Sequence, residues 1–380
     1  MPRKEMYFSN LDALRFISFL FIFWGHALDT ESVIVKNSDL YAVLKNYVYI
    51  LGKTGFSFAF VLSSYINTWV ILEERESSGK YHPLQFYIRR ALRIWPLYFL
   101  MIFVCFVFFP LIKMAANEPF AIDTPAWPFL VFVGNFYMIE HGFPYLPALS
   151  VLWSVSVEEQ FYLLWPWLLL LFHRQRLWLI SLLLVVFIAF MAIYFDKLNV
   201  FFHSLFLCGD IGIGALFAFI SFQPKGKSFQ LLSSLPKVAI LSVYAIFLLL
   251  ILRYKPVFEN ELLPAWLNLV LERLTFASLL GFFIFEQNFC TNSFLKFGKF
   301  KVINYLGLIS YGLFCFHEIG LMIAYRVMEL FGGKDTLIWE LALKPIFASM
   351  LIIPVAALSF KFFEMPFLKL KKRFYGKRPT

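Results

Sequence analysis

Ten apolar segments, each close to the length of a membrane-spanning helix, recur from one end of this 380-residue chain to the other. A helix needs about 20 mostly apolar residues to cross the hydrocarbon core of a bilayer. The segments lie near residues 11–28, 47–71, 91–112, 151–172, 177–195, 202–222, 237–252, 267–286, 305–328 and 338–360. They predict an all-α, polytopic integral membrane protein with about ten transmembrane helices. We expect one membrane domain over residues 1–380.

The composition excludes a soluble globular protein. Hydrophobic residues make up 61% of the chain and charged residues only 15%, whereas soluble domains have about 45–50% and about 25%. This number of apolar side chains exceeds what one buried core can hold. Most of them must therefore face lipid. A further apolar stretch, 127–139, is interpreted as a re-entrant or interfacial segment.

The distribution of basic residues predicts the orientation in the membrane. The formal net charge is +10, but Lys and Arg occur in short clusters between apolar segments, a pattern that favours membrane topology over nucleic-acid binding. Most of them lie at the two ends of the chain and in alternate loops. The positive-inside rule therefore predicts both termini in the cytoplasm, with 29–46 and 113–146 outside. Because Arg15 interrupts the first apolar segment and no cleavage pattern follows it, we expect a retained helix rather than a signal peptide.

Several ionisable residues lie inside or at the ends of predicted spans, where charges are costly and the default interpretation is a functional group or a buried partner. They are Asp12, Arg15, His26, Glu158, Glu159, Asp210, His317 and Glu318. Histidine takes and gives a proton near neutral pH, so His26 and His317 are candidates for a general base or acid. Either histidine alone is also compatible with a hydrogen-bonded structural role. The whole set also fits a proton-coupled membrane transporter.

Two short spacings suggest local pairs on the first predicted helix. Asp12 and Arg15 are three residues apart, so they share a helix face and can form an ion pair. Asp29 follows His26 by three residues. It either holds the imidazole in one tautomer or is solvated beyond the helix end.

A basic cluster precedes the third predicted span. Arg90 and Arg93 are three residues apart and share one face of a helix, where two guanidinium groups can bind a phosphate bidentately. One interpretation is a cytoplasmic phosphorylated cofactor. The alternative is an anchor that contacts lipid head groups.

Common catalytic and metal-binding motifs are absent from the sequence. No Gly-x-Ser-x-Gly elbow surrounds the serines before Glu158, and there is no phosphate loop or dinucleotide fingerprint. The four cysteines are scattered singly in apolar surroundings, which is typical of core residues. No Cys or His pair has metal-ligand spacing, so we expect no metal site.

Six blocks in a fixed order resemble the membrane acyltransferase 3 family, the integral-membrane O-acyltransferases that include O-antigen and Nod-factor acetylases. The most specific block is Trp-Ser-Val-Ser-Val-Glu-Glu-Gln-Phe-Tyr at 153–162. The resemblance covers nearly the whole chain. The other matching strings lie at 11–15 with 25–27, 60–65, 90–98, 310–317 and 363–366. One departure is Ser64, where the family often has Gly, which raises the question of how closely a helix approaches span 2. A second is that no soluble hydrolase-like domain is appended.

The resemblance implies a fold of roughly ten helices that moves an acyl group, usually acetyl, from cytoplasmic acyl-coenzyme A to a hydroxyl group of a carbohydrate or other cell-envelope acceptor. It implies that His26 is the catalytic histidine, Arg15 its functional neighbour, and Glu159 and His317 further members of the site. Arg90 and Arg93 match the donor-side arginine motif. In this interpretation His26 either deprotonates the acceptor hydroxyl or accepts the acyl group itself, while Arg15 stabilises negative charge on the carbonyl oxygen.

The main alternative remains the proton-coupled transporter. Transporters are often built from repeats with paired Gly- or Pro-interrupted segments in corresponding halves. The sequence has neither an internal repeat nor such paired segments. We therefore expect an acyltransferase in the cell membrane whose partners are the lipid bilayer and a glycan acceptor.

Overall fold

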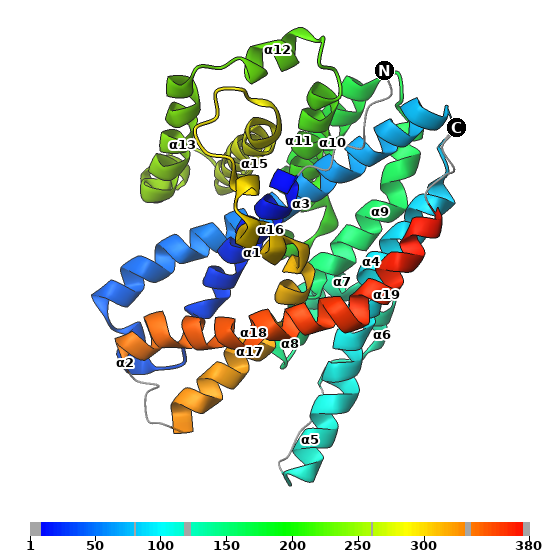
Figure 1. The fold of residues 1–380 in the computed structure, drawn as a ribbon. Helices are drawn as coiled ribbons and strands as arrows, with labels where there is room; N and C mark the ends of the chain where they lie inside the picture. Colours follow the sequence, from blue (N-terminus) through cyan, green and yellow to red (C-terminus); the bar gives the residue numbers. More distant parts are fainter. Residues whose placement is uncertain (1–8, 80, 118–122, 260, 331–335, 375–380) are drawn as a thin grey trace.

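The computed structural model describes residues 9–79, 81–117, 123–259, 261–330 and 336–374. Over these residues the chain is helical and contains no strand (Figure 1). The predicted all-α class is therefore confirmed for the described part of the chain.

The helices of the first half include two long ones, α3 and α4, the latter continued by a π-helical turn. In order they are α1 (Ser9–Ala27), α2 (Val33–Lys36), α3 (Asp39–Ser78), α4 (Pro83–Phe103), η1 (Val104–Phe108), α5 (Phe109–Ala115), α6 (Trp127–Leu130), α7 (Gly134–His141), α8 (Pro147–Ser150), α9 (Trp153–Leu171) and α10 (Arg176–Tyr194).

The second half ends in a long helix with two π-helical turns. Its elements are η2 (Val200–Phe202), η3 (Ser204–Leu207), α11 (Cys208–Ser221), α12 (Lys227–Ser233), α13 (Lys237–Leu252), α14 (Tyr254–Phe258), α15 (Ala265–Phe289), η4 (Phe297–Lys299), α16 (Lys301–Leu308), α17 (Ser310–Leu330), η5 (Trp339–Leu343), α18 (Lys344–Leu358), η6 (Ser359–Glu364), α19 (Met365–Lys371) and η7 (Lys372–Phe374).

All ten predicted apolar segments are helical, but the count of ten spans is not confirmed. In the described part of the chain, 6 helices are long and apolar enough to cross a membrane, or up to 8 when each of two bent pairs counts as one span. Neither α1 nor α9 is among them. These two helices carry Asp12, Arg15, Glu158 and Glu159, and such residues lower the hydropathy of a helix.

One predicted span is bent within its own length, and another is bent against the short helix that precedes it. The predicted span 305–328 consists of α16 and α17, which meet at 75°, and α13 meets the short α12 at 86°. The apolar stretch 127–139 forms the two short helices α6 and α7. Hydropathy reports where apolar residues occur, but not where the helix axis turns.

The helices α1 and α3 cross at a pair of glycines, Gly25 directly before His26 and Gly52 on α3. A Cβ added to Gly25 would lie 2.9 Å from the Cα of Gly52, so only glycine allows the backbones to come this close. The crossing sets the position of the C-terminal turn of α1, and therefore of His26, against α3.

The departure from the family pattern at Ser64 does not prevent close packing in this region. Ser64 is buried on α3 and donates a hydrogen bond to the carbonyl oxygen of Ile211 at 2.7 Å. The small residue is instead Gly214 of α11, where an added Cβ would lie 2.3 Å from the carbonyl oxygen of Val61. The close approach of α3 and α11 is thus provided by the other helix.

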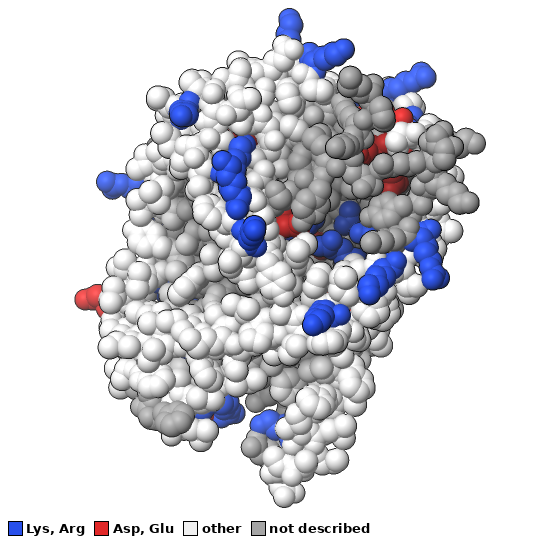
Figure 2. All heavy atoms as spheres, viewed as in Figure 1, with Lys and Arg blue, Asp and Glu red and all other residues white. Residues whose placement is uncertain are grey.

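Charged side chains are distributed unevenly over the surface. Figure 2 shows most of the visible Lys and Arg atoms on the upper part of this face, and blue and red atoms recessed in a hollow right of centre. The broad remainder of the face, which includes the outer surfaces of α4, α5 and α18, carries few charges (Figures 1 and 2). Such a division is typical of a protein with a lipid-facing belt.

Candidate functional site

A pocket of about 160 Å³ with several charged lining residues lies where α1, α3, α4, α9 and α17 converge. Pockets that hold a whole ligand have about 300–1,000 Å³, so this one suits an extended chain better than a nucleotide. Its charged and polar lining residues include Arg15, Asn67, Arg90, Arg93, Glu158 and Tyr162. With three arginines and one carboxylate among these residues, the lining favours an anionic ligand.

One face of α1 extends from this pocket to His26. The pocket-lining residues of α1 include Arg15, Phe19 and Ile22, and steps of three or four residues keep a helix face constant. His26 is four residues beyond Ile22 and therefore lies on the same face. Arg15 and His26 are separated along the helix by about 16 Å at a rise of 1.5 Å per residue.

The three arginines of α4 make two kinds of contact. Arg90 and Arg93 both line the pocket, in agreement with the shared face that their spacing predicts. The guanidinium of Arg90 also lies over the ring of Tyr162, 5.5 Å from its centroid. Arg89 is buried and points elsewhere, where it pairs with Glu74 and donates to the carbonyl oxygen of Phe374. Arg89 is therefore placed as a structural contact to the C-terminal segment.

Arg15 lies at the arginine end of the pocket and forms the ion pair with Asp12 that the sequence spacing predicts. Three helical turns separate it from His26. Arg15 therefore belongs geometrically with Arg90 and Arg93, and not with the histidine to which the family resemblance assigns it as a neighbour.

Of the two adjacent glutamates on α9, Glu158 lines the pocket. It accepts a hydrogen bond from Tyr162, whose hydroxyl is also 2.8 Å from that of Ser63. Glu159, the residue that the resemblance indicates, accepts instead from the indole of Trp95 at 3.0 Å and is not among the pocket-lining residues. The geometry favours Glu158 as the carboxylate that faces a ligand.

Two histidines and a glutamate meet beyond the other end of the pocket. His26 Nδ1 lies 2.9 Å from Glu318 Oε1, and His317 Nε2 lies 3.6 Å from the same oxygen. The two imidazole rings are 5.3 Å apart. His317 and Glu318 are buried, whereas 32% of the His26 side chain is exposed. The helices α1 and α17 thus bring together groups from opposite ends of the chain.

Hydrogen bonding defines which nitrogens of the cluster carry protons. His317 Nδ1 lies 2.5 Å from the carbonyl oxygen of Phe314. A carbonyl only accepts, so Nδ1 carries the hydrogen and Nε2 of neutral His317 has a free lone pair. By the same argument His26 donates from Nδ1 to ionised Glu318, which leaves His26 Nε2 as a proton acceptor.

Aromatic rings connect the pocket with the histidines. Phe56 lines the pocket and lies edge-on to His26, with centroids 6.3 Å apart. Phe19 and Phe314 also line it and lie 6.0 Å and 5.6 Å from the ring of His317. A ligand that entered along the arginines would therefore meet these rings before it reached the histidines.

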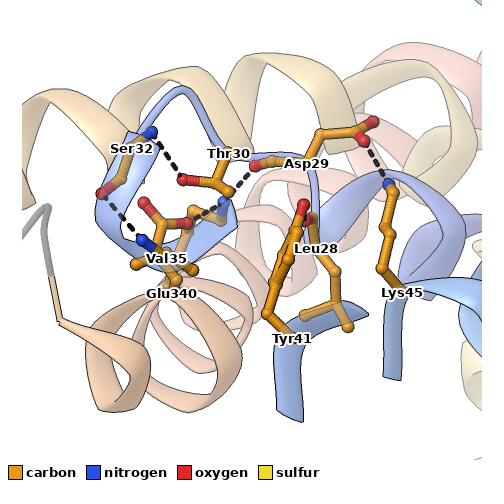
Figure 3. A network of polar contacts seen from close by, with 9 residues as sticks. Leu28, Asp29, Thr30, Ser32, Val35, Tyr41, Lys45 and Glu340 are labelled. Carbon is orange, nitrogen blue, oxygen red and sulfur yellow. Dashed lines mark hydrogen bonds and ion pairs between the residues drawn. The ribbon is translucent and has the colours of Figure 1, made fainter. Parts of the chain in front are cut away.

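Asp29 follows the end of α1 and 66% of its side chain is exposed, which confirms the second of the two predicted alternatives, a solvated residue beyond the helix end. Its carboxylate pairs with Lys45 of α3 and does not contact His26, and its backbone carbonyl accepts a hydrogen bond from Lys344 at 2.5 Å. Figure 3 shows Asp29 between Lys45 on one side and Glu340 on the other. Sequence reasoning missed the actual partner of His26, which is Glu318.

The buried pair Lys344–Glu340 holds the C-terminal end of α1. Their side chains are 3% and 1% exposed, and Lys344 Nζ lies 2.5 Å from a carboxylate oxygen of Glu340. Lys344 is therefore shared between Glu340 and the carbonyl of Asp29, three residues after His26. Tyr41 adds a hydrogen bond to the carbonyl of Leu28 at 2.9 Å (Figure 3). Together these contacts fix the chain where α1 ends.

Lys344→Met should destabilise the protein by about 3–5 kcal/mol, because it leaves the buried carboxylate of Glu340 without its cation. The measurement is thermal unfolding in detergent. Lys45→Met is the matched control, since its partner Asp29 has 66% of its side chain exposed and such surface pairs contribute about 0–1 kcal/mol. Adding Glu340→Gln to Lys344→Met should recover much of the loss. Equal shifts for Lys344→Met and Lys45→Met would contradict this assignment.

Asp210, to which no specific role could be assigned from the sequence, forms a buried ion pair. It accepts from Arg273 Nε at 2.7 Å and also from the hydroxyl of Ser57. The guanidinium of Arg273 lies 4.7 Å from the ring centroid of Phe206. Asp210 therefore joins α11, α15 and α3 and lies outside the pocket lining.

Comparison with known proteins gives an independent result. Residues 8–360 match the family model described as an acyltransferase domain. The peptidoglycan O-acetyltransferase OatA of Listeria monocytogenes is 28% identical over 338 residues, which cover 84% of this chain and 51% of that protein. The O-acetyltransferase OatA of Staphylococcus aureus is 30% identical over 183 residues, which cover 44% of this chain and 30% of that protein. The chain thus spans about half the length of the Listeria protein, and its match covers a smaller share, 30%, of the Staphylococcus protein. No solved structure matches the chain.

Proposed function

The chain belongs to the acyltransferase family whose model it matches over residues 8–360, and we propose that it transfers an acetyl group from acetyl-coenzyme A to a hydroxyl group of a cell-envelope carbohydrate. The names of the two relatives, a peptidoglycan O-acetyltransferase and an O-acetyltransferase, support the group transferred and the class of acceptor. Multiple apolar helices make the chain a multi-pass protein of the cell membrane.

The observation that carries this proposal is the arrangement of the pocket, with three arginines at one end and a histidine paired with a carboxylate beyond the other. Coenzyme A carries its phosphates and its thioester at opposite ends of a long pantetheine arm. Arg15, Arg90 and Arg93 suit the phosphates. The separation of about 16 Å along α1 then requires the arm to run through the pocket toward His26.

The His26–Glu318 pair supports a general-base mechanism. Glu318 accepts from His26 Nδ1, so it orients the ring and stabilises the imidazolium that forms when Nε2 takes a proton. The acceptor hydroxyl loses its proton to His26 Nε2 while its oxygen attacks the thioester carbonyl. The carbon–sulfur bond then breaks, and the leaving thiolate takes the proton back from His26. The products are the acetyl ester and free coenzyme A.

The arginines act on the donor and not on the reacting carbonyl. Because Arg15 is three turns from His26, its charge is better placed for a phosphate than for an oxyanion at the histidine. It lies with Arg90 and Arg93 in the same lining. We therefore propose that all three arginines bind the donor. Glu158 and Tyr162, which line the same pocket, would contact its pantetheine arm.

The proposed activity is tested by incubating the purified chain in lipid with radiolabelled acetyl-coenzyme A, with and without cell-envelope glycan. We expect labelled glycan that forms only when donor, acceptor and protein are all present. Vesicles that contain the protein provide the comparison with a proton-coupled transporter. Proton flux without any labelled acceptor would contradict the acyltransferase proposal.

We further propose that both termini and the donor end of the pocket face the cytoplasm, because basic residues concentrate at the ends of the chain and in alternate loops. In a cysteine-free background, a cysteine replacing Glu140 should react with an impermeant reagent added outside, whereas one replacing Lys299 should not. Both positions are exposed. Outside labelling at Lys299 would contradict this orientation.

A further inference from the structure

We propose that His26, His317 and Glu318 form a binding site for a divalent transition-metal ion such as Zn²⁺. One ligand atom from each of the three side chains lies within 4.8 Å of the other two. Two imidazoles and a carboxylate are the ligand set of many zinc sites that keep one position open. The sequence spacing predicted no such site, because the residues come from opposite ends of the chain.

The two distances that involve Glu318 fit a tetrahedral ion after a small adjustment. Ligand atoms about 2.1 Å from Zn²⁺ are about 3.4 Å from one another. The His26–Glu318 and His317–Glu318 distances are 2.9 Å and 3.6 Å, on either side of that value. A movement of a few tenths of an ångström therefore suffices for these two edges.

The observation that most favours a cation site here is the environment of His317 Nε2. This atom is buried and has no hydrogen-bond partner among the described residues. Its lone pair faces Glu318 Oε1 at 3.6 Å, so two acceptors point at each other in a buried environment, which is unfavourable. A cation between them satisfies both groups.

The remaining contacts resemble the outer shell of a metal site. Metal-bound histidine almost always donates its other ring N–H to a carbonyl or carboxylate, and His317 Nδ1 donates to the carbonyl of Phe314. Its ring is thereby already aimed with Nε2 toward Glu318. The half-exposed His26 gives an ion access from the outer end of α1, and a water molecule would take the fourth position.

Metal binding and acyl transfer exclude each other at this site. A coordinated His26 has lost the Nδ1 proton that Glu318 accepts, and its ring is held by the ion instead of by that hydrogen bond. Zn²⁺ should therefore inhibit transfer. This consequence alone rests on the proposed function, whereas binding of the ion does not.

The test is titration of the metal-stripped full chain in detergent with Zn²⁺ by calorimetry and with Co²⁺ by visible absorption. We expect one ion per chain and the absorption of tetrahedral Co²⁺. His317→Gln and Glu318→Gln should each weaken binding at least 10–100-fold. The exposed His141, changed to Gln, is the matched control and should bind as the parent does.

Thermal unfolding of each variant shows whether it is folded, and His26→Gln provides a third ligand variant if one of the others is not. Absence of stoichiometric binding to the parent would overturn the proposal, as would unchanged affinity in the folded ligand variants. Metal binding without transfer activity would uphold the site and contradict the proposed function. Transfer activity without metal binding would uphold the proposed function and overturn the metal site.

Discussion

His26→Gln should lower the rate of acyl transfer by about 10²–10⁴-fold, the usual cost of removing a general base. Glutamine keeps an amide N–H that can donate to Glu318, so the buried carboxylate retains a partner. It cannot accept and return a proton. The rate of labelled glycan formation and the thermal stability in detergent are measured together, and we expect loss of the first with little change in the second.

The choice of glutamine follows from the Glu318 contact. His26→Ala would remove the imidazole and leave a buried carboxylate unpaired, so loss of activity could reflect damage to packing. His82→Gln is the control, because His82 is exposed and makes no side-chain cap hydrogen bond. A near-parental rate for His26→Gln would contradict the general-base assignment.

Apolar patterning predicted where helices form, and its failures are concentrated at the candidate pocket. All ten predicted segments are helical. However, α1 and α9 are not among the helices apolar enough to pass as spans, because they carry the charged groups that line or border the pocket. Charged residues can bind a ligand, but they also lower the mean hydropathy of the helix that carries them. A count of spans by hydropathy is therefore least accurate near the candidate site.

Local spacing predicted those parts of the site that lie within one helix. The pair Asp12–Arg15 and the shared face of Arg90 and Arg93 both follow from a repeat of 3.6 residues, and the structure contains both. No comparable rule connects α1 with α17. The contact of His26 with Glu318 depends on how two distant helices pack, so the sequence offered only the weaker signal of a carboxylate in the middle of an apolar segment.

The buried pair at the C-terminal end of α1 has a recognisable pattern in the sequence. Glu340 and Lys344 both fall within the predicted span 338–360 and are four residues apart, which is the spacing of a helical ion pair. Two charges inside an apolar segment suggest that they are buried together. That Lys344 also binds the carbonyl of Asp29 could not be predicted, because this contact joins segments from opposite ends of the chain.

Replacing both Arg90 and Arg93 with alanine should weaken binding of acetyl-coenzyme A by about 10²–10⁴-fold. A charge-assisted hydrogen bond contributes about 1.5–3 kcal/mol, so two lost contacts correspond to about 3–6 kcal/mol. Each single alanine variant should lose about 10–100-fold. Lysine should restore little, because it lacks the planar pair of donors that binds a phosphate bidentately. The measurement is donor affinity by calorimetry, alongside the apparent affinity for the glycan acceptor, which should change much less.

Arg89→Ala separates donor binding from the general effect of losing a charge on α4. Arg89 precedes Arg90 directly, but it is buried against Glu74 and the carbonyl of Phe374, away from the pocket lining. Its loss should therefore lower thermal stability and leave the donor affinity of the folded protein near that of the parent. If Arg89→Ala and Arg93→Ala lowered the affinity for acetyl-coenzyme A equally, the arginines would act only as an anchor at the membrane surface. Loss of donor affinity in the Arg90 and Arg93 variants, but not in Arg89→Ala, requires that the donor binds between α1, α4 and α9. From there a path leads along α1 to His26.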